Sequence, residues 1–175
     1  QYFHVSAESF FQVNTAQAEK MIDLVCDYLP TKGKSLLELY AGVGLFTRFV
    51  ADRYELIYAV EESTSACDDL AINLDEYDHI NLYVGSVKEI VPQLDIQPEA
   101  ILLDPPRAGV DPRTLESILA YKAQHIVYIS CDVSTLSRDL KRLIEAGYHL
   151  VEITPFDMFP QTFHVECVAM LTLDE

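Results

Sequence analysis

The chain has 175 residues, half of them apolar, and a formal net charge of −16. The length favours one domain with a substantial core, and the apolar content excludes an intrinsically disordered protein. The apolar runs are too short to cross a bilayer, so we expect no membrane partner, and the acidic charge argues against this polypeptide gripping nucleic acid unaided.

The four cysteines, Cys26, Cys67, Cys131 and Cys167, are widely separated and form no C-x-x-C pair. This spacing disfavours a structural zinc or a cluster site, so we expect no metal and a reduced, cytoplasmic protein. The sequence begins at Gln1 without a methionine. We therefore expect it to be a piece of a longer protein.

The first half of the chain alternates helical patterns with apolar runs. Asn14 can cap a helix whose apolar residues share one face: Ala18, Met21, Ile22, Val25 and Leu29. Strands are expected at 35–40, 56–61 and 80–85. A glycine turn joins the first strand to a helix that begins near Leu45, and Ser63 can cap a helix that carries Ala66, Leu70 and Leu74.

The second half continues this alternation, with strands expected at 100–104 and 125–130. Asp111-Pro112 combines a cap with a first-turn proline and starts a helix with Leu115, Ile118 and Leu119 turned inward. The next helix is expected to be capped near Ser134 and to bury Leu136, Leu140, Leu143 and Ile144.

Two final strands are expected at about 148–154 and 165–173, with no helix between them. They therefore pair antiparallel. The earlier strands read apolar throughout and are separated by amphipathic helices, which is typical of a parallel sheet covered on both faces. The sequence predicts an α/β domain with a mostly parallel, seven-stranded sheet, helices on both faces and an antiparallel C-terminal pair.

Sheets of this kind bind ligands beyond the carboxyl ends of their strands. After the first strand, Gly42 and Gly44 form a G-x-G turn, and Thr47 stands where a dinucleotide fingerprint has its third glycine. Glu61 ends the second strand and can accept hydrogen bonds from ribose hydroxyls. Taken alone, Glu61 is equally well explained as a solvated carboxylate at the start of a helix. Together, the turn and the acid favour an adenosine-bearing cofactor, and the missing glycine favours S-adenosylmethionine over a nicotinamide cofactor.

The fourth strand ends in the segment "LLDPPRAG", in which two prolines follow Asp104. Proline fixes the backbone and offers no N–H donor, so the loop should be stiff, with its carboxylate and carbonyls facing a ligand. The alternative is that the two prolines merely stop the strand. We favour a functional carboxylate at Asp104.

The fifth strand ends at Cys131, just ahead of a helix N-terminus whose dipole favours a thiolate. This place suits a nucleophile, whereas the other cysteines read as ordinary buried residues. The aromatic segment Phe156 to Glu166 either caps the core or forms the wall of a pocket for a flat ligand. His164 and Glu166 lead from it into the last strand, where Glu166 would be a second catalytic group if it lies opposite Cys131.

These residues resemble the S-adenosylmethionine-dependent RNA uracil-C5 methyltransferases, which make 5-methyluridine in transfer and ribosomal RNA. Five segments carry the resemblance: "FFQVN" (10–14), "ELYAGVGLF" (38–46), "LLDPPRAG" (102–109), "YISCDVSTLSRDL" (128–140) and "DMFPQTFHVE" (157–166). The resemblance implies a Rossmann-like class I methyltransferase fold and one catalytic domain over residues 1–175. It also implies that Cys131 is the nucleophile, that Glu166 is the base, and that the cofactor is held by Gln12, Tyr40, Gly42, Glu61, Ser86 and Asp104.

The resemblance further implies an RNA substrate, tRNA or rRNA, and an N-terminal portion before Gln1, commonly with a small oligonucleotide-binding barrel. Two positions depart from the family pattern. Asp132-Val133 replaces Asn-Pro, which should loosen the loop and set a carboxylate against ionisation of the thiol. Ser86 replaces the Asp or Asn that the family commonly offers to adenine.

Three other functions stay open at this point. An amino-group methyltransferase also uses an acid and two prolines, although Arg107 follows the prolines here and a nucleophilic cysteine would be idle. A non-catalytic, cofactor-binding domain is compatible with Ser86 and Val133. A nicotinamide oxidoreductase fits the glycine pattern least well.

Overall fold

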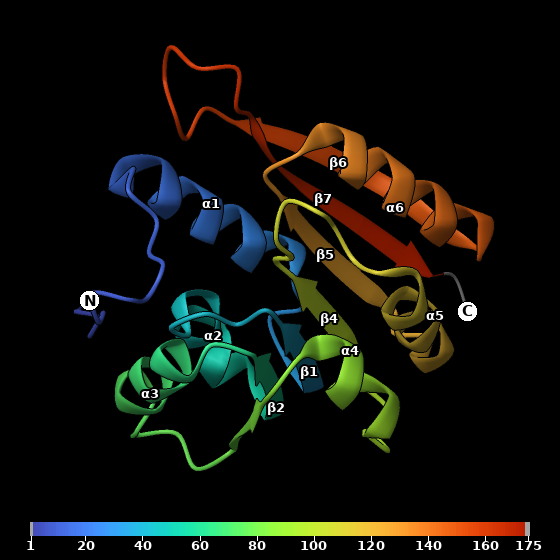
Figure 1. Cartoon of the computed structure of the whole chain (residues 1–175). Helices are drawn as coiled ribbons and strands as arrows, with labels where there is room; N and C mark the ends of the chain where they lie inside the picture. Colours follow the sequence, from blue (N-terminus) through green and yellow to red (C-terminus); the bar gives the residue numbers. More distant parts are fainter. Residues whose placement is uncertain (1, 174–175) are drawn as a thin grey trace.

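A computed structural model describes residues 2–173, which fold around a single seven-stranded sheet (Figure 1). The strands are β1 (Gly33–Leu39), β2 (Tyr54–Glu61), β3 (Ile80–Val84), β4 (Ala100–Leu103), β5 (His125–Ser130), β6 (Tyr148–Phe156) and β7 (Glu166–Leu173). Their order across the sheet is β3-β2-β1-β4-β5-β7-β6. The first five strands are parallel, whereas β7 pairs antiparallel with both β5 and β6. The predicted architecture is confirmed.

The helices are α1 (Thr15–Tyr28), α2 (Leu45–Val50), α3 (Thr64–Asn73), α4 (Val87–Ile90), α5 (Pro112–Tyr121) and α6 (Val133–Glu145), with 3-10 turns at Ala51–Arg53 and Val91–Gln93. The predicted caps of α1, α3 and α5 are confirmed, because Asn14, Ser63 and Asp111 each accept hydrogen bonds from the first turn of their helix. The sequence did not predict α4, because four residues are too few to show a helical period.

Two expectations for α6 are wrong. The cap is Asp132, whose carboxylate accepts hydrogen bonds from the backbone N–H groups of Ser134 and Thr135, so Ser134 lies within the helix. Ile144 is 46% exposed, although Leu136, Leu140 and Leu143 are buried as predicted. At about 100° per residue, Ile144 is turned about 80° from Leu136, so it lies at the side of the buried face.

Side chains that alternate along the strands divide the core into two layers. On one face, Leu36 and Ile57 pack with α1 and α2, and a smaller cluster around Ala59 packs with α3. On the other face, Leu37 and Val60 pack with α4, α5 and α6. Helices therefore cover both faces of the sheet.

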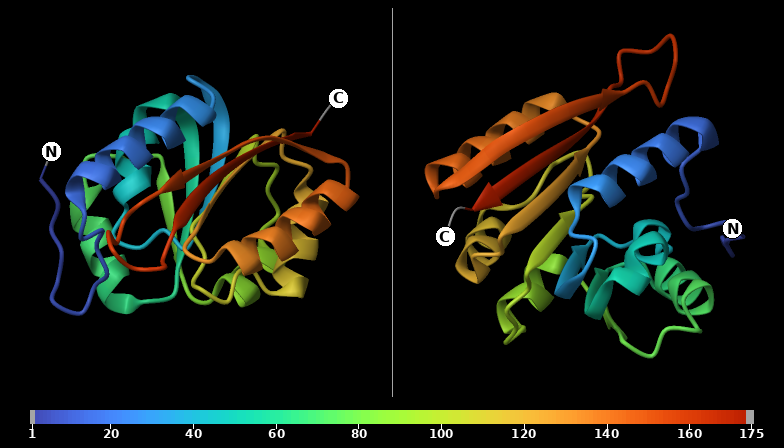
Figure 2. Two further views of the ribbon diagram at one scale, coloured as in Figure 1. Left: turned by 90° about the horizontal axis from the view of Figure 1, so that it is seen from above. Right: turned by 180° about the vertical axis from the view of Figure 1, so that it is seen from behind.

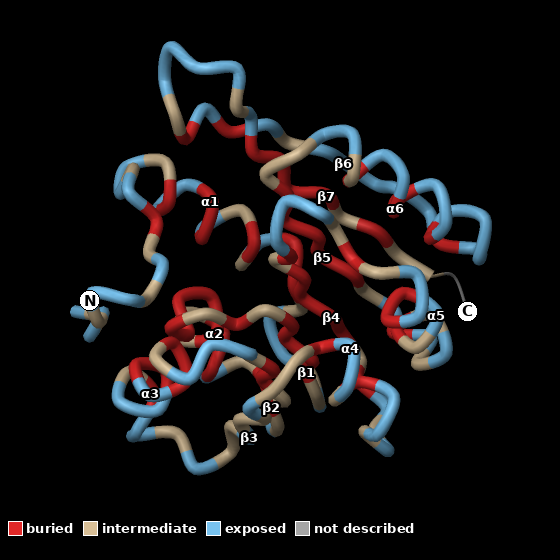
Figure 3. The backbone as a smooth tube through the Cα atoms, viewed as in Figure 1, coloured by how far each residue is buried: buried red, intermediate tan, exposed pale blue. Residues whose placement is uncertain are grey.

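Burial is concentrated in the central strands, whereas β6 at the edge of the sheet is largely exposed (Figure 3). None of the helices within residues 2–173 is long and apolar enough to span a membrane. The parallel strands β1, β2, β4 and β5 end on the same edge of the sheet, and this edge carries the candidate site.

Candidate functional site

Strand register brings three of the predicted site residues to one edge of the sheet. Leu39 pairs with Val60 on one side and with Leu103 on the other. Tyr40 follows Leu39, Glu61 follows Val60 and Asp104 follows Leu103. These three residues therefore lie at neighbouring strand ends. This is the carboxyl edge, where α/β sheets bind ligands.

The turn after β1 is built from left-handed backbone. Tyr40 has φ of 64°, which is uncommon for a residue other than glycine and marks local strain, so β1 ends one residue earlier than predicted. Gly42 has φ of 55°, and a Cβ atom there would meet nothing within 4 Å. Gly44 has φ of 81°, and a Cβ atom there would lie 3.0 Å from Leu74. Gly44 thus permits packing against α3, whereas Gly42 leaves open space at the carboxyl edge.

The Glu61 carboxylate is fixed between this turn and the start of α3. Its Oε2 accepts a hydrogen bond from Gly42 N at 2.8 Å. Its Oε1 accepts hydrogen bonds from Glu62 N at 2.9 Å and Ser63 N at 2.8 Å. Each carboxylate oxygen has two lone pairs, so one oxygen keeps a free lone pair for a ligand hydroxyl.

Cys131 and Glu166 come together through the antiparallel pairing of β5 and β7. Ser130, the last residue of β5, pairs with Cys167, the second residue of β7. In an antiparallel pair, the residue after Ser130 lies at the same end as the residue before Cys167. Cys131 therefore lies opposite Glu166, as the catalytic interpretation of Glu166 required.

A cavity of about 530 Å³ connects these strand ends. Seven of the eight predicted site residues line it: Gln12, Tyr40, Gly42, Glu61, Asp104, Cys131 and Glu166. Ser86 is the exception, because it precedes α4 and is absent from the cavity wall. Its neighbour Gly85 donates a hydrogen bond to the Glu61 carbonyl, so Ser86 stays near that strand end without lining the cavity.

The chain before α1 supplies a further wall of the cavity that sequence reasoning located only in part. Glu8, Phe10 and Phe11 line the cavity together with Gln12. Gln12 is 6% exposed, and its Oε1 is buried without a hydrogen-bond partner among the described residues. A buried acceptor that lines a cavity and lacks a partner marks a place where a ligand donor fits.

Burial and nearby carboxylates both oppose ionisation of Cys131. Burial raises the pKa of the Cys131 thiol, the charges of Glu166 and Asp104 raise it further, and Arg107 lowers it. Burial, followed by the charges of Glu166 and Glu61, raises the pKa of Asp104 to about 7. Burial and these two carboxylates therefore oppose the thiolate that the helix N-terminus is expected to favour.

We expect the pH profile of Cys131 alkylation to report this environment. A raised pKa means that less thiolate is present at neutral pH, so the alkylation rate should rise with a midpoint above the ordinary thiol value of about 8.5. Glu166→Gln should move the midpoint down, because it removes one carboxylate charge. Peptide-level mass spectrometry of iodoacetamide labelling, without cofactor or RNA, measures this. The same profile in the urea-unfolded chain is the control, and an identical midpoint in the two states would contradict the assignment.

Glu38 is a buried carboxyl group that the sequence analysis missed. It lies in β1, is 2% exposed, and accepts a hydrogen bond of 2.6 Å from the Thr47 hydroxyl. Burial raises the pKa of Glu38 to about 8, and the charge of Asp104 adds to this effect. The only sign of this burial in the sequence is the position of an acidic residue inside an apolar strand.

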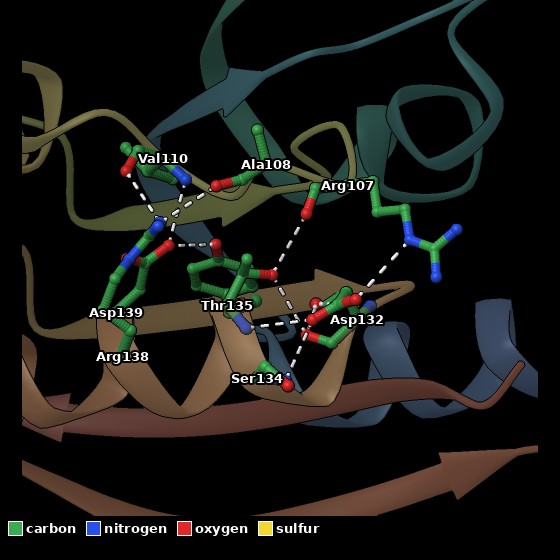
Figure 4. Close-up of polar contacts among 10 residues, drawn as sticks. Arg107, Ala108, Val110, Asp132, Ser134, Thr135, Arg138 and Asp139 are labelled. Atoms are coloured by element: carbon green, nitrogen blue, oxygen red, sulfur yellow. Dashed lines mark hydrogen bonds and ion pairs between the residues drawn. The ribbon is translucent and has the colours of Figure 1, made fainter.

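Asp132 links the loop that carries Cys131 to α6 and to the loop after β4. Its carboxylate caps α6 and also lies 3.5 Å from Arg107 Nε (Figure 4). Thr135 Oγ1 donates to the Arg107 carbonyl at 3.2 Å, which adds a second link between the loops. The carboxylates that oppose ionisation of Cys131 are those of Glu166 and Asp104. Asp132 therefore acts as a cap and a loop contact.

A buried carboxylate holds the far end of the loop after β4 against α6 (Figure 4). Asp139, which is 1% exposed, accepts hydrogen bonds from Val110 N at 2.9 Å and from the Tyr128 hydroxyl at 2.8 Å. Arg138 donates to Asp139 and to the carbonyls of Ala108 and Val110. These bonds fix the loop that begins at Asp104 relative to the helix that follows Cys131.

Of the two possibilities that the sequence allowed for the aromatic segment before β7, the structure shows the first, in which the segment caps the core. Phe156 and Met158 are buried in the core cluster on the α1 side. Phe163 is 83% exposed, and its ring centroid lies 4.2 Å from that of His164. The cavity wall includes Glu166 and no other residue of this segment. In the part of the chain that the structure describes, no three His, Cys, Asp or Glu residues are grouped to bind a metal ion.

Comparisons with known proteins relate the chain to RNA methyltransferases. The sequence profile of tRNA (uracil-5-)-methyltransferases matches residues 1–173. An uncharacterized RNA methyltransferase of Oceanobacillus iheyensis is 37% identical over 177 residues, covering 98% of this chain and 39% of the relative. Another, from Clostridium acetobutylicum, is 38% identical over 175 residues, covering 97% and 38%. The chain thus spans about two fifths of the curated relatives that it matches.

Solved structures agree with these sequence matches. The crystal structure of Pyrococcus abyssi tRNA (uracil-54, C5)-methyltransferase in complex with S-adenosyl-L-homocysteine superimposes with a TM-score of 0.82 at 33% identity, covering 94% of this chain and 40% of that one. An N-methyltransferase of Bradyrhizobium japonicum, at 14% identity and a TM-score of 0.75, shares the fold alone. The predicted Rossmann-like class I methyltransferase fold is confirmed.

Proposed function

The chain belongs to the tRNA (uracil-5-)-methyltransferase family, and from this membership we propose that residues 1–175 are the catalytic domain of an S-adenosylmethionine-dependent RNA methyltransferase. The methyl acceptor is carbon 5 of a uridine. Cys131 acts as the nucleophile and Glu166 as the base. The observation that carries this proposal is the meeting of Cys131 and Glu166, from opposed strands, in one cavity with Glu61 and Gly42.

The cavity residues fit S-adenosylmethionine, which is the cofactor of this family. Glu61 keeps a lone pair for a ribose hydroxyl, while its other hydrogen bonds hold it in place. Gly42 leaves room for close approach of the ligand to the backbone, and the unpartnered Oε1 of Gln12 accepts a ligand N–H group. Asp104 and Tyr40 line the same space and complete the pocket. A contact between Ser86 and the cofactor stays a prediction from the resemblance.

Uracil requires a covalent partner because its carbon 5 is a weak nucleophile. Addition of the Cys131 thiolate to carbon 6 converts the ring into an enolate and makes carbon 5 electron-rich. S-adenosylmethionine supplies an electrophilic methyl group on a positively charged sulfonium. Cys131 reacts as the thiolate. Burial, followed by the charges of Glu166 and Asp104, raises the pKa of its thiol, so a cationic group that enters the cavity would favour the reactive form.

Glu166 completes the reaction. After methylation, carbon 5 carries both the methyl group and a hydrogen, and the Glu166 carboxylate accepts that proton. The electron pair left on carbon 5 then forms the C5–C6 double bond and expels the Cys131 sulfur. Burial raises the pKa of Glu166, which strengthens it as a base near neutral pH.

The charge of this domain does not favour RNA binding. The formal charge of −16 opposes phosphate binding, so we propose that RNA binding depends on a region N-terminal to this chain. The target uridine is in tRNA or rRNA and reaches the cavity by leaving its base stack. Such a protein works in the cytoplasm, where the RNA and a reduced thiol are found together.

Nucleoside analysis tests the reaction and separates it from its alternatives. The protein is incubated with uridine-containing RNA and methyl-labelled S-adenosylmethionine, and the digested RNA is resolved by mass spectrometry. Label in 5-methyluridine is the expected result. Label in an N-methylated base would favour the amino-group methyltransferase, and cofactor binding without any transfer would favour the non-catalytic domain.

A further inference from the structure

A network of hydrogen bonds outside the catalytic groups fastens the N-terminal segment to α3. We call residues 4–9 the strap. It precedes α1 and runs past α3 (Figure 2). None of the bonds that hold the strap to α3 involves Cys131, Glu166 or Glu61. Their position nevertheless bears on the cavity, because the next residues of the chain form one of its walls.

Asp69 is the centre of this network. It lies on the buried side of α3 and is fully buried. Its Oδ2 accepts a hydrogen bond from Ser6 N at 2.8 Å, and its Oδ1 accepts one from Ser6 Oγ at 2.6 Å. His4 Nδ1 lies 2.8 Å from the same Oδ1. Hydrogen bonds from Ser6 hold the pKa of Asp69 well below its usual range, so the group is a carboxylate with both oxygens engaged.

Asn73 extends the attachment by one helical turn. His4 N donates to Asn73 Oδ1 at 2.6 Å, and Asn73 Nδ2 donates back to the His4 carbonyl at 3.0 Å. The same Nδ2 donates to the Val43 carbonyl at 2.9 Å, within the glycine turn after β1. Ser9 Oγ and Ser65 Oγ, 3.0 Å apart, add a contact near the start of α3. The strap is thus attached to α3 along its length, and Asn73 connects it to the cofactor turn.

The segment beyond the strap is held at its other end as well. Asn14 caps α1, and its Nδ2 donates to the Met158 carbonyl at 3.3 Å. Glu8, Phe10, Phe11 and Gln12 lie at the end of the strap or between it and Asn14, and they line the cavity. The cavity wall is therefore a short, irregular segment stretched between two attachments. Detaching one end removes the constraint that keeps Gln12 aimed at the ligand.

We propose that Asp69 is a positioning residue for S-adenosylmethionine, which sets the affinity of the cavity by docking the strap on α3. The inference deepens the proposed function and rests on it, since it assumes that the cofactor binds in this cavity. Neither Asp69 nor Ser6 lines the cavity. Both act through the segment that does. If only a fraction of molecules has a docked strap, the apparent Kd rises in inverse proportion to that fraction.

Four variants test the inference by calorimetric titration with S-adenosylmethionine, well below the thermal midpoint of each protein. Asp69→Asn replaces an acceptor with an N–H₂ group that faces Ser6 N, and we expect its Kd to rise about tenfold. Ser6→Ala should raise the Kd in the same direction, and Ser6→Thr, which keeps the hydroxyl, should restore it. Asp68→Asn is the matched control, because Asp68 is the exposed neighbour on α3.

Amide hydrogen exchange supplies a readout that overall destabilisation would not reproduce. Residues 5–12 should exchange faster in Asp69→Asn, while the amides of β1, β4 and β5 keep their protection. Unchanged cofactor affinity in Asp69→Asn and Ser6→Ala, beside a wild-type chain that binds, would overturn this inference and leave the proposed function intact. Failure of the wild-type chain to bind would overturn both.

Discussion

Cys131→Ala is expected to lower the rate of RNA methylation by at least about four orders of magnitude, with cofactor binding largely retained. Without the thiolate, carbon 5 of uracil never becomes electron-rich, so no other side chain in the cavity can replace the sulfur. Cys131 is only partly buried at the end of β5, and removing it creates little cavity in the core. The loss should therefore be confined to turnover.

Methyl transfer to RNA and calorimetry with S-adenosylmethionine, run side by side, measure this effect. Cys26→Ala is the matched control, since Cys26 is a free, partly buried cysteine on α1, away from the cavity. That variant should keep full activity. Substantial methylation by Cys131→Ala would refute the covalent mechanism and return the amino-group alternative to consideration.

Glu166→Gln is expected to slow turnover about 10²- to 10⁴-fold by stopping the reaction after methyl transfer. Glutamine keeps the shape of the side chain but does not accept the proton from carbon 5. The Cys131 sulfur then stays bound to carbon 6, and the protein–RNA adduct accumulates. Gels that retain covalent complexes should show a band of lower mobility that contains both protein and methylated RNA.

Two controls test whether the adduct depends on Glu166 and on the sulfur of Cys131. Glu116→Gln changes an exposed carboxyl group on α5 and should form no lasting adduct. The double variant Cys131→Ala with Glu166→Gln should form none either, because the adduct requires the sulfur. Full activity of Glu166→Gln, without an adduct, would show that another group removes the proton.

Local patterns were enough to predict the sheet and most helices. Apolar runs of four to eight residues separated by amphipathic periods specify parallel strands and their covering helices. Asn14, Ser63 and Asp111 were recognisable caps because their side chains satisfy nearby N–H groups in their own segment. The same rule failed at α6, where Asp132 and Ser134 both fit a cap and only the three-dimensional turn distinguishes them.

The candidate site was predictable because sheet topology converts positions in the sequence into a common edge. One predicted site residue lies at or just after the end of each of four parallel strands: Tyr40, Glu61, Asp104 and Cys131. The parallel topology alone therefore predicts that they line one cavity. Glu166 required the antiparallel pairing of the last two strands. The placement of Ser86 outside the cavity wall was not predictable, because the sequence did not show that a short helix, α4, begins directly after it.

Long-range polar contacts lay beyond sequence reasoning. Asp69 looked like any helical acid, and its burial follows from Ser6 and His4, more than sixty residues earlier in the chain. The pKa of Cys131 likewise depends on the charges of Glu166 and Asp104, which only the fold brings near it. A helix dipole is visible in a sequence, whereas the carboxylates that oppose it are not.

Calorimetric titration of the chain with S-adenosylmethionine tests the central claim most directly, with Glu61→Ala as the test variant. Glu55→Ala, at the other end of β2 and exposed, is the matched control. We expect saturable one-to-one binding by the wild type and the control. Glu61→Ala should bind about 10- to 150-fold more weakly, since a hydrogen bond to a charged group contributes about 1.5–3 kcal/mol. Absence of binding by the wild-type chain, or equal binding by Glu61→Ala, would contradict the assignment of this cavity to the cofactor.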